Sequence, residues 1–503
     1  MQKETRFIFA FQFCSHLFLL RTVSLSYTLV SNFHTIVRLK GCSPLLIAFL
    51  LLHLHQKPAI MKYVIAIILL WSLFAECLAQ EVWRVERCIA YAVTHNHDVR
   101  LQSFALKDYK IERTKAAGAF LPAIEGNVGG QYNFGRAIDP ETNTYTNVNT
   151  FYNSYQLSAH LPLFDGLQRY NELRAAKANL LMGKSKLQAQ KDATAQRVLQ
   201  SYIEVLYCRG SVVIAKQKRA ESEMLLQQTR VMVEVGTKGE ADVAQMEATY
   251  ATDDYEVTHQ QSLYDKALLT LKQLMNYPIE EPLELAPEEE MLAEITPCLP
   301  EESEAIYALA KLDNPDIKQA EYSLRSARYA YRASKGALLP SISLGAGVST
   351  TFYKQLNSPN NTSFSQQFKN NAGEYLYATL SVPIFNRLNT LSAIRRQRNN
   401  LRRAEEELDY RRNELNRLIK EAVTDQENSR KETEKLKAKV EADSLASHLT
   451  TRKYEEGLAS SIDVQTGAVT LLQSKAKLLQ SKLTYIYKTK MINYYKGKPL
   501  WTE

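Results

Sequence analysis

Residues 454–464 have the sequence YEEGLASSIDV, and the same pattern of residues occurs earlier in the chain. Residues 233–243 have the sequence VEVGTKGEADV, so a glycine and an Asp-Val pair recur at an offset of 221 residues (457 − 236 and 463 − 242). Gly236 and Gly457 suit the left-handed backbone that ends a helix. Because each glycine follows a long run without proline, the sequence predicts two helical hairpins, each with a glycine turn.

An aspartate follows each glycine turn, at the start of the next predicted helix. A carboxylate at this place accepts hydrogen bonds from free backbone N–H groups and interacts favourably with the helix dipole. We therefore expect Asp242 and Asp463 to cap their helices, whatever further role they have.

The repeat extends beyond the hairpins. Leu339-Pro340 repeats Leu121-Pro122 at an offset of 218 residues (340 − 122), and residues 382–385 repeat residues 161–164 at an offset of 221 (383 − 162). Solenoid repeats have a much shorter period, so this pattern indicates a duplicated structural unit. The predicted parts are a first repeat at 80–277, an acidic connector with several prolines at 278–313 and a second repeat at 314–503.

Polar and apolar residues alternate in two segments of each repeat, which is typical of β-strands. We take Pro122, Pro162, Pro340 and Pro383 as the strand boundaries. The predicted strands lie near 124–134, 155–161, 342–352 and 376–382, and polar, Asn-rich loops lie at 137–150 and 354–373. One apolar face opposite a small, polar face is the pattern of a transmembrane β-barrel. The alternative is a soluble sandwich with a dry inner face.

Four strands are too few to close a barrel, because the smallest membrane barrels have about eight. Open strand edges are not tolerated in lipid, where no water satisfies the backbone. Several chains must therefore contribute to one barrel, and three chains would supply about twelve strands.

Long helices are predicted between the strand pair and the glycine turn of each repeat. Residues 167–235 and 388–456 contain no proline, and each run would form a helix of roughly 100 Å. Heptad spacing of apolar residues in the second run predicts a coiled coil. Shorter helices are expected near 97–119, 242–276, 315–337 and 463–496, and two of these would stack end to end beside each long one.

The N-terminus resembles a leader. Residues 61–79 combine a charged start, a short apolar core and small residues before Gln80, as secretory signal peptides do. Cys77 offers the alternative of a lipoprotein anchor, although Glu76 precedes it where a small residue is expected. We expect residues 1–60 to be a non-native upstream extension, with Met61 as the true start.

The formal net charge of +8 depends on this leader. Residues 1–79 hold seven Lys/Arg and two acids, which leaves 62 − 7 = 55 basic and 54 − 2 = 52 acidic residues, or +3. This balance excludes nucleic acid as an expected partner. Only Cys88, Cys208 and Cys298 follow the leader, too few for a disulfide framework.

The paired prolines and the Tyr-x-x-Gly-x5-Asp-Val pattern of residues 454–464 resemble those of the TolC-like outer-membrane efflux family. The resemblance covers about residues 81–498. It implies a fold that is mainly α with membrane β: a homotrimer with a twelve-stranded barrel in the outer membrane of a Gram-negative bacterium, continued by a helical tunnel through the periplasm. It also implies the partners, which are outer-membrane lipid, a periplasmic adaptor protein and an inner-membrane pump of an efflux or type I secretion system.

The resemblance also suggests roles for residues in the hairpin turns. It implies that Asp463 faces the pore and forms an acidic ring in the trimer, with Thr466 at the place of a second acid in the family's best-known pattern. Asp242 and Tyr454 match groups that link the coils in the closed state. Ala459 stands where that pattern has a basic residue, so both the ring and the latch are expected to be weaker here.

Catalytic and cofactor motifs do not emerge from the sequence. His95 and His97 lie two residues apart without a third ligand in view, which favours a helix start over a metal site. We therefore expect no enzyme, no metal and no cofactor. The alternatives to a channel are a periplasmic adaptor, which should have one hairpin and lipoyl-like segments, and a structural coiled-coil protein of the envelope, which should lack strands.

Overall fold

The computed structural model describes residues 82–138, 143–147, 149–287, 291, 302–356 and 361–501. Within this part, the chain from Val82 onward forms one compact unit. The predicted upstream extension and signal peptide lie outside the described residues, as do residues 288–290 and 292–301 of the acidic connector.

Helices of the two repeats match in order and length. The first repeat contains α5 (Val85–His95), α6 (His97–Gly118), α7 (Gln168–Glu234) and α8 (Glu240–Met275). The second contains α10 (Ser303–Asp313), α11 (Pro315–Gly336), α13 (Asn389–Glu455) and α14 (Ser461–Tyr495). The two long helices both have 67 residues, which confirms the predicted duplication of the helical part.

Asparagine caps explain one of the repeated motifs. The Asn96 side chain accepts hydrogen bonds from the backbone N–H groups of Asp98 and Val99, at the start of α6. Asn314 does the same for Asp316 and Ile317 at the start of α11. Each cap satisfies donors that the first helical turn leaves free. The pattern Asn-x-Asp, present at residues 96–98 and 314–316, therefore marks a helix start in both repeats.

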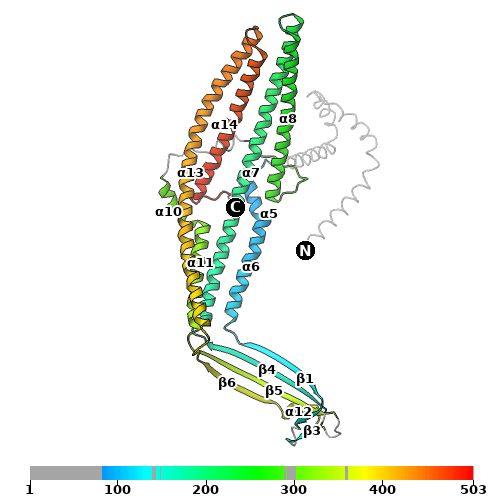
Figure 1. The fold of residues 1–503 in the computed structure, drawn as a ribbon, viewed down its shortest axis with the longest axis vertical. Helices are drawn as coiled ribbons and strands as arrows, with labels where there is room; N and C mark the ends of the chain where they lie inside the picture. The colour runs from blue at the N-terminus through cyan, green and yellow to red at the C-terminus, as the bar shows by residue number, and fades with distance from the viewer. Residues whose placement is uncertain are drawn as a thin grey trace, which may run out of the picture. The chain divides into compact units, whose positions relative to one another are not determined.

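Each long helix packs against two shorter ones, as expected. In Figure 1, α6 and α8 follow one another along α7, and α11 and α14 do so along α13. Helix α11 also contacts α7 and so joins the two repeats. The largest apolar core lies where α5, α7, α8 and α14 meet, and its fully buried side chains include Ile89, Tyr202, Met275 and Ile486.

The predicted connector contains a helix. Its last part forms α10, whose buried Ile306 and Ala310 pack against Leu408, Leu415 and Ile419 of α13. Ile306 and Ala310 stand four residues apart, so they share one face of a helix. The apolar heptad positions of α13 are therefore partly covered by a helix of the connector.

Four antiparallel strands form one sheet in the order β1-β4-β5-β6. They are β1 (Ala123–Asn133), β4 (Thr150–Phe164), β5 (Ser341–Gln355) and β6 (Gly373–Ser381). Leu157 lies opposite Gly126 on one side and Val348 on the other, and Leu344 lies between Leu161 and Ala378. Directly paired residues point to the same face, so the register gathers the predicted apolar positions on one face of the sheet.

The loops between paired strands have more structure than the sequence suggested. A small hairpin, β2 (Arg136–Ile138) with β3 (Tyr145–Asn147), stands in the first loop. The short helix α12 (Phe364–Asn370) stands in the second, and its Phe364 and Phe368 rings pack against Tyr155 of β4. These aromatic contacts join segments distant in sequence, which is why composition alone did not predict them.

Candidate functional site

One glycine turn connects the two helices of each hairpin. Gly236 ends α7 with φ = 78° and Gly457 ends α13 with φ = 76°. In the second turn the N–H of Gly457 donates to the Tyr454 carbonyl (3.0 Å) and that of Leu458 to the Lys453 carbonyl (2.7 Å). This backbone conformation is one that side chains other than glycine rarely adopt, so both glycines are required by the turns.

Asp463 caps α14 in a reciprocal arrangement. Its Oδ2 accepts hydrogen bonds from the Ser460 backbone N–H (3.0 Å) and hydroxyl (2.7 Å), and its own N–H donates to Ser460 Oγ (3.2 Å). The Ser460 hydroxyl and N–H lower the pKa of the Asp463 carboxyl below its ordinary value. Asp463 is therefore an ionised, exposed cap whose carboxylate is held in one place.

Thr466 lies one turn further along α14. Its Oγ1 donates to the Ile462 carbonyl (2.8 Å), and both Thr466 and Asp463 are exposed. Residues three apart share a helix face. The two predicted constriction residues therefore lie on one solvent-facing surface of α14.

Tyr454 and Asp242, the two predicted latch residues, each contact a residue of the other hairpin. Tyr454 is fully buried, and its hydroxyl lies 3.0 Å from Oγ1 of Thr229 on α7. Burial raises the pKa of Tyr454 above its ordinary value. Asp242 accepts a hydrogen bond at its Oδ1 from Ser461 of the other hairpin (3.5 Å) and at its Oδ2 from Gly239 N–H (3.3 Å).

Lys238 is a further linking residue that the sequence interpretation missed. Its ammonium lies 4.2 Å from the Tyr454 ring centroid and donates to the Ala459 carbonyl (3.4 Å). At an offset of 221, Lys238 is the counterpart of Ala459 (459 − 238). The second turn has no basic residue at Ala459, but the first turn has one at the equivalent position, Lys238. A position-by-position comparison of the two turns would have found it.

A cavity of about 390 Å³ lies between the hairpins, next to this link. Leu225, Met246 and Val464 line its apolar part and also belong to the cluster around Tyr454. Asp253 is buried there and pairs with Lys218 at 2.7 Å. The two hairpins are therefore joined by an apolar cluster, by buried polar groups and by contacts at the turns.

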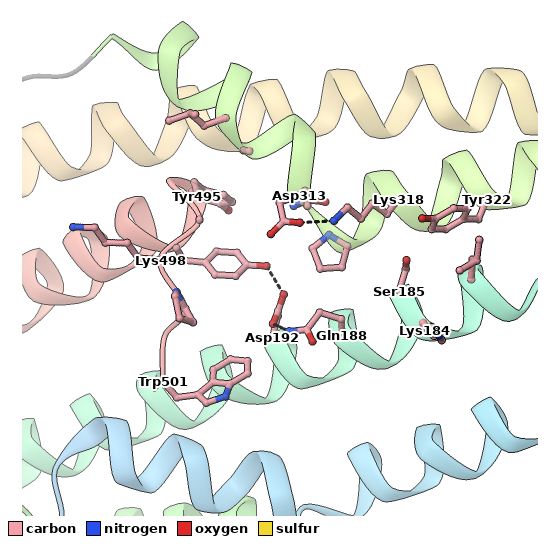
Figure 2. Close-up of a pocket in the computed structure, with 18 residues that line it drawn as sticks. Lys184, Ser185, Gln188, Asp192, Asp313, Lys318, Tyr322, Tyr495, Lys498 and Trp501 are labelled. Carbon is pink, nitrogen blue, oxygen red and sulfur yellow. Dashed lines mark hydrogen bonds and ion pairs between the residues drawn. The ribbon is translucent and has the colours of Figure 1, made fainter. Parts of the chain in front are cut away.

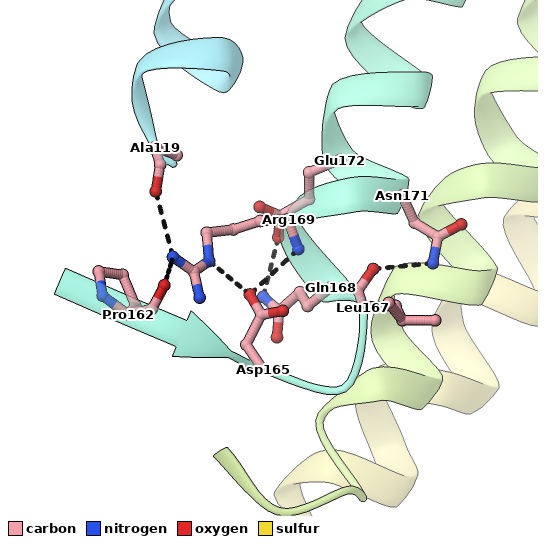
Figure 3. A network of polar contacts seen from close by, with 8 residues as sticks. All are labelled: Ala119, Pro162, Asp165, Leu167, Gln168, Arg169, Asn171 and Glu172. Carbon is pink, nitrogen blue, oxygen red and sulfur yellow. Dashed lines mark hydrogen bonds and ion pairs between the residues drawn. The ribbon is translucent and has the colours of Figure 1, made fainter. Parts of the chain in front are cut away.

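The strand-to-helix turns differ between the repeats. In the first, Arg169 Nε donates to Asp165 Oδ2 (2.7 Å), and its Nη1 donates to the carbonyls of Ala119 (3.2 Å) and Pro162 (2.9 Å). Figure 3 shows this guanidinium between the end of α6 and the end of β4. The counterparts of Asp165 and Arg169 are the uncharged Asn386 and Thr390, and the Asn386 side chain bonds to the Thr390 hydroxyl and N–H.

Two of the four predicted boundary prolines stand directly before strands. Pro122 precedes β1 and Pro340 precedes β5. Pro162 lies inside β4, where the register with β5 shifts before Phe164, and Pro383 lies beyond the end of β6. A proline can occupy a strand at an irregularity because the bulge removes the need for its N–H.

A second cavity, of about 480 Å³, lies where the C-terminal segment packs against α7, α10 and α11. The Tyr494 hydroxyl donates a hydrogen bond to the carboxylate of the buried Asp192, at 2.8 Å. Figure 2 shows Asp192 and Gln188 among the residues that line this cavity. Burial raises the pKa of Asp192, and the negative charges of Asp316 and Asp313 add to this, although Tyr494 and Gln188 donate hydrogen bonds that oppose it.

Metal and thiol chemistry find little support here. Within the described ranges, no group of three or more His, Cys, Asp or Glu side chains could hold a metal ion. His97 begins α6 and His95 ends α5, as expected of a helix boundary. Cys88 and Cys208 are free and buried, and burial raises their thiol pKa values to about 12 and about 11.

The chain was compared with known proteins. The family model "Outer membrane efflux protein" matches residues 89–277 and 306–488, one match in each repeat. The alkaline protease secretion protein AprF of Pseudomonas aeruginosa is 22% identical over 437 residues, covering 85% of this chain and 88% of AprF. The outer membrane efflux protein BepC of Brucella suis is 24% identical over 367 residues, covering 73% and 75%.

The fold is also similar to that of solved channels. The structure of CusC superposes with a TM-score of 0.70 at 17% identity, covering 82% of this chain and 92% of that one. TolC-like channels are trimeric and are parts of efflux or secretion systems. Since the family model matches both repeats across most of the chain, this protein belongs to the outer membrane efflux protein family, as a non-enzymatic TolC-like channel of the outer membrane with a periplasmic helical part.

Proposed function

We propose that three copies of this chain form one exit duct, which passively conducts substrates received from an inner-membrane pump. The observation that carries this proposal is the four-stranded sheet with one apolar face and two unpaired edges, β1 and β6. Unpaired backbone groups cost several kcal/mol each in lipid. Three sheets joined edge to edge leave no free edge and give about twelve strands, within the range of membrane barrels.

The paired hairpin turns are the proposed gate and the proposed contact with a periplasmic adaptor protein. Asp463 and Thr466 share an exposed face of α14, which in a threefold assembly would line the constriction. Tyr454 and Asp242, with Gly236 and Gly457 shaping the turns, would hold the two hairpins of each copy together. The relationship to AprF and BepC supports a pump of either a type I secretion or a tripartite efflux system.

The domain assignment belongs to the same proposal. Residues 61–79 direct export as a signal peptide, 80–277 and 314–503 are the two repeats, and 278–313 connect them. Residues 1–60 are not part of the native protein. Mass spectrometry of the intact protein from outer membranes should give a mature N-terminus near Gln80; a mass that includes residues 1–60 would refute the assignment.

Assembly is tested on the protein extracted from outer membranes in mild detergent. Native mass spectrometry should give a trimer, and gel migration should change on heating as the barrel unfolds. A stable, membrane-inserted monomer would overturn the proposed duct. Expression in a strain without its own exit channel should restore dye efflux or protein secretion when the matching pump and adaptor are present. If either the pump or the adaptor is omitted, no transport should occur.

A further inference from the structure

The cavity of about 390 Å³ between the two hairpins is within the range of about 300–1,000 Å³ that is typical of small-molecule sites. Helices α7, α8, α13 and α14 all contribute to its wall, so a molecule inside it would contact both hairpins of one chain. The apolar side chains of the wall come from α7, α8 and α14: Met224, Leu225, Met246, Val464, Ala468 and Leu471. They form a surface against which a compact apolar body can pack.

A lysine, an aspartate and a serine occur together in each hairpin at the repeat offset of 221 residues (439 − 218, 474 − 253 and 443 − 222). The first set is Lys218, Asp253 and Ser222, and the second is Lys439, Ser474 and Asp443. The lysines are equivalent, whereas the aspartate and the serine have exchanged helices. Each set is therefore a control for the other.

The second set is complete. Asp443 Oδ2 accepts hydrogen bonds from Lys439 Nζ, at 2.8 Å, and from the Ser474 hydroxyl. Both donors lower the pKa of the Asp443 carboxyl below its ordinary value. The side chains of Asp443 and Lys439 are 18% and 48% exposed, so water reaches this pair. This set lies outside the wall of the cavity.

The first set lacks one donor. Lys218 Nζ donates to Asp253 Oδ1 at 2.7 Å, but the Ser222 hydroxyl donates to the Arg219 carbonyl instead, at 3.0 Å. The Asp253 side chain is 3% exposed, and its Oδ2 has no hydrogen-bond partner within the part of the chain that the structure describes. The same is true of Gln228 Oε1, and both side chains line the cavity. Buried acceptors without donors destabilise a protein, so a donor inside the cavity would be stabilising.

We propose that this cavity binds a small organic amine, whose ammonium group donates hydrogen bonds to Asp253 and Gln228. An ammonium group is a donor with no acceptor atom, which is what two unpartnered acceptors require. Rotation about the side-chain bonds of Asp253 and Gln228 turns the free oxygens towards the bound donor. The apolar body of the amine packs against the apolar wall from α7, α8 and α14.

The free acceptors select the ligand, because the charges of the wall nearly balance. Lys218 and Lys475 stand against Asp253 and Glu221. A carboxylate ligand would gain no hydrogen bond from the free oxygens and would be repelled by Asp253. An amine of the same shape gains charge-assisted hydrogen bonds there.

A bound amine contacts both hairpins and so stabilises the arrangement in which they lie together, because a ligand favours the state that it binds. Each chain contains the whole cavity, so binding itself is independent of the proposed assembly. Only the effect on conductance rests on the proposed gate.

Calorimetric titration with adamantylamine tests the site on the outer-membrane protein, transferred from detergent to amphipol. Adamantane carboxylate is the matched ligand, because it joins the same hydrocarbon cage to an acceptor group. Asp253→Asn keeps an oxygen for Lys218 and places an amide N–H₂ at the free acceptor, so it should weaken amine binding about tenfold or more. Gln228→Met removes the second acceptor and should weaken binding about fivefold.

Asp443→Asn is the matched control, because it makes the same change in the second set, outside the cavity. Amine binding that adamantane carboxylate does not match, weakened by Asp253→Asn and Gln228→Met but not by Asp443→Asn, supports the proposal. Absence of amine binding, equal binding of the carboxylate, or an equal loss in Asp443→Asn overturns it. If Asp253→Asn does not fold, Gln228→Met decides.

Planar-bilayer recordings test the consequence for the hairpins. Adamantylamine added on the periplasmic side should lower the conductance of the parent protein more than that of Gln228→Met. Equal conductance changes in the two proteins would overturn the stabilising effect on the hairpins. Amine binding by a parent protein that forms no trimer would support the site and overturn the proposed duct.

Discussion

At the scale of single residues, Asp463 combines a structural and a proposed electrostatic role. Its carboxylate caps α14 through Ser460, and its pKa is lowered by those hydrogen bonds. Asn can accept the same hydrogen bonds without a charge. We expect Asp463→Asn to keep the tip folded and to reduce cation selectivity in planar-bilayer recordings, because three charges would be lost from the constriction.

Two controls separate the roles of Asp463. Asp463→Ala removes both cap and charge, so it should also destabilise the start of α14 by about 0.5–2 kcal/mol. Thr466→Asp should increase cation selectivity, because it adds a second acidic ring on the same helix face. Unchanged selectivity in the Asn variant would mean that Asp463 is a cap only.

Asp192 should make stability depend on pH. Its pKa is raised in the folded protein, mainly by burial, so the folded state binds this proton more tightly than the unfolded state. The contribution of this group to stability is full below its ordinary value of 3.8 and is lost as the pH rises through the folded-state pKa. Melting temperatures of the solubilised protein should therefore fall as the pH is raised above about 4.

The variant Asp192→Asn isolates that contribution. Its amide oxygen can still accept the Tyr494 hydrogen bond but carries no charge, so we expect a higher melting temperature at pH 7 and a flatter pH profile. Asp192→Leu removes the acceptor as well and should gain less, because the buried Tyr494 hydroxyl is then unsatisfied. An Asn variant that keeps the parent's pH profile would exclude Asp192 as its source.

At the scale of secondary-structure elements, the sheet has two chemically different faces. Leu344 lies between Leu161 and Ala378 on the apolar face, while Ser343 lies between Pro162 and Thr379 on the other. A basic residue on the lipid face costs about 2–4 kcal/mol near mid-depth. Leu344→Arg should therefore reduce the amount of assembled channel in outer membranes far more than Ser343→Arg. Equal assembly would refute the assigned faces.

In the first repeat, the side chain of Arg169 connects the end of the strand to the start of the long helix. The equivalent residue of the second repeat is the uncharged Thr390. Arg169 connects Asp165, Pro162 and Ala119, and its side chain is 13% exposed. We expect Arg169→Met to lower stability by about 1–3 kcal/mol, because the Asp165 carboxylate and two backbone carbonyls lose a charged donor. Thr390→Val is the matched control in the second repeat and should cost less. Denaturant titration of the solubilised protein measures both, and equal losses would show that the cation adds nothing.

At the scale of the whole molecule, the two hairpins of one chain are coupled where Tyr454 meets Thr229. We expect Tyr454→Phe to weaken this coupling by about 0.5–1.5 kcal/mol and to increase single-channel conductance, because the hairpins can separate more easily. Tyr250→Phe, in the same apolar cluster, is the control.

Since the pKa of Tyr454 is raised, its hydroxyl stays protonated at neutral pH. The conductance of the parent protein should therefore not change through this group between pH 6 and 8.

Rules that involve only neighbouring residues predicted most of the helices and strands of this protein from its sequence. A left-handed glycine ends a helix, an aspartate or asparagine caps the next one, and alternation marks a strand with two faces. Each rule depends on neighbours along the chain, and the duplicated spacing shows every rule twice. For this reason the sequence predicted the long helices, the four main strands and the glycine turns, whereas the family followed from the resemblance of its motifs.

Contacts between distant segments were decided only by the tertiary structure. Tyr494 and Asp192 stand 302 residues apart, and Tyr454 and Thr229 stand 225 apart. Lys238 reaches the other turn, and α10 covers part of α13. Such contacts depend on how the helices cross and on which side chains then face each other. Periodicity along one element carries no information about that geometry, because it specifies the buried face of a helix but not its neighbour.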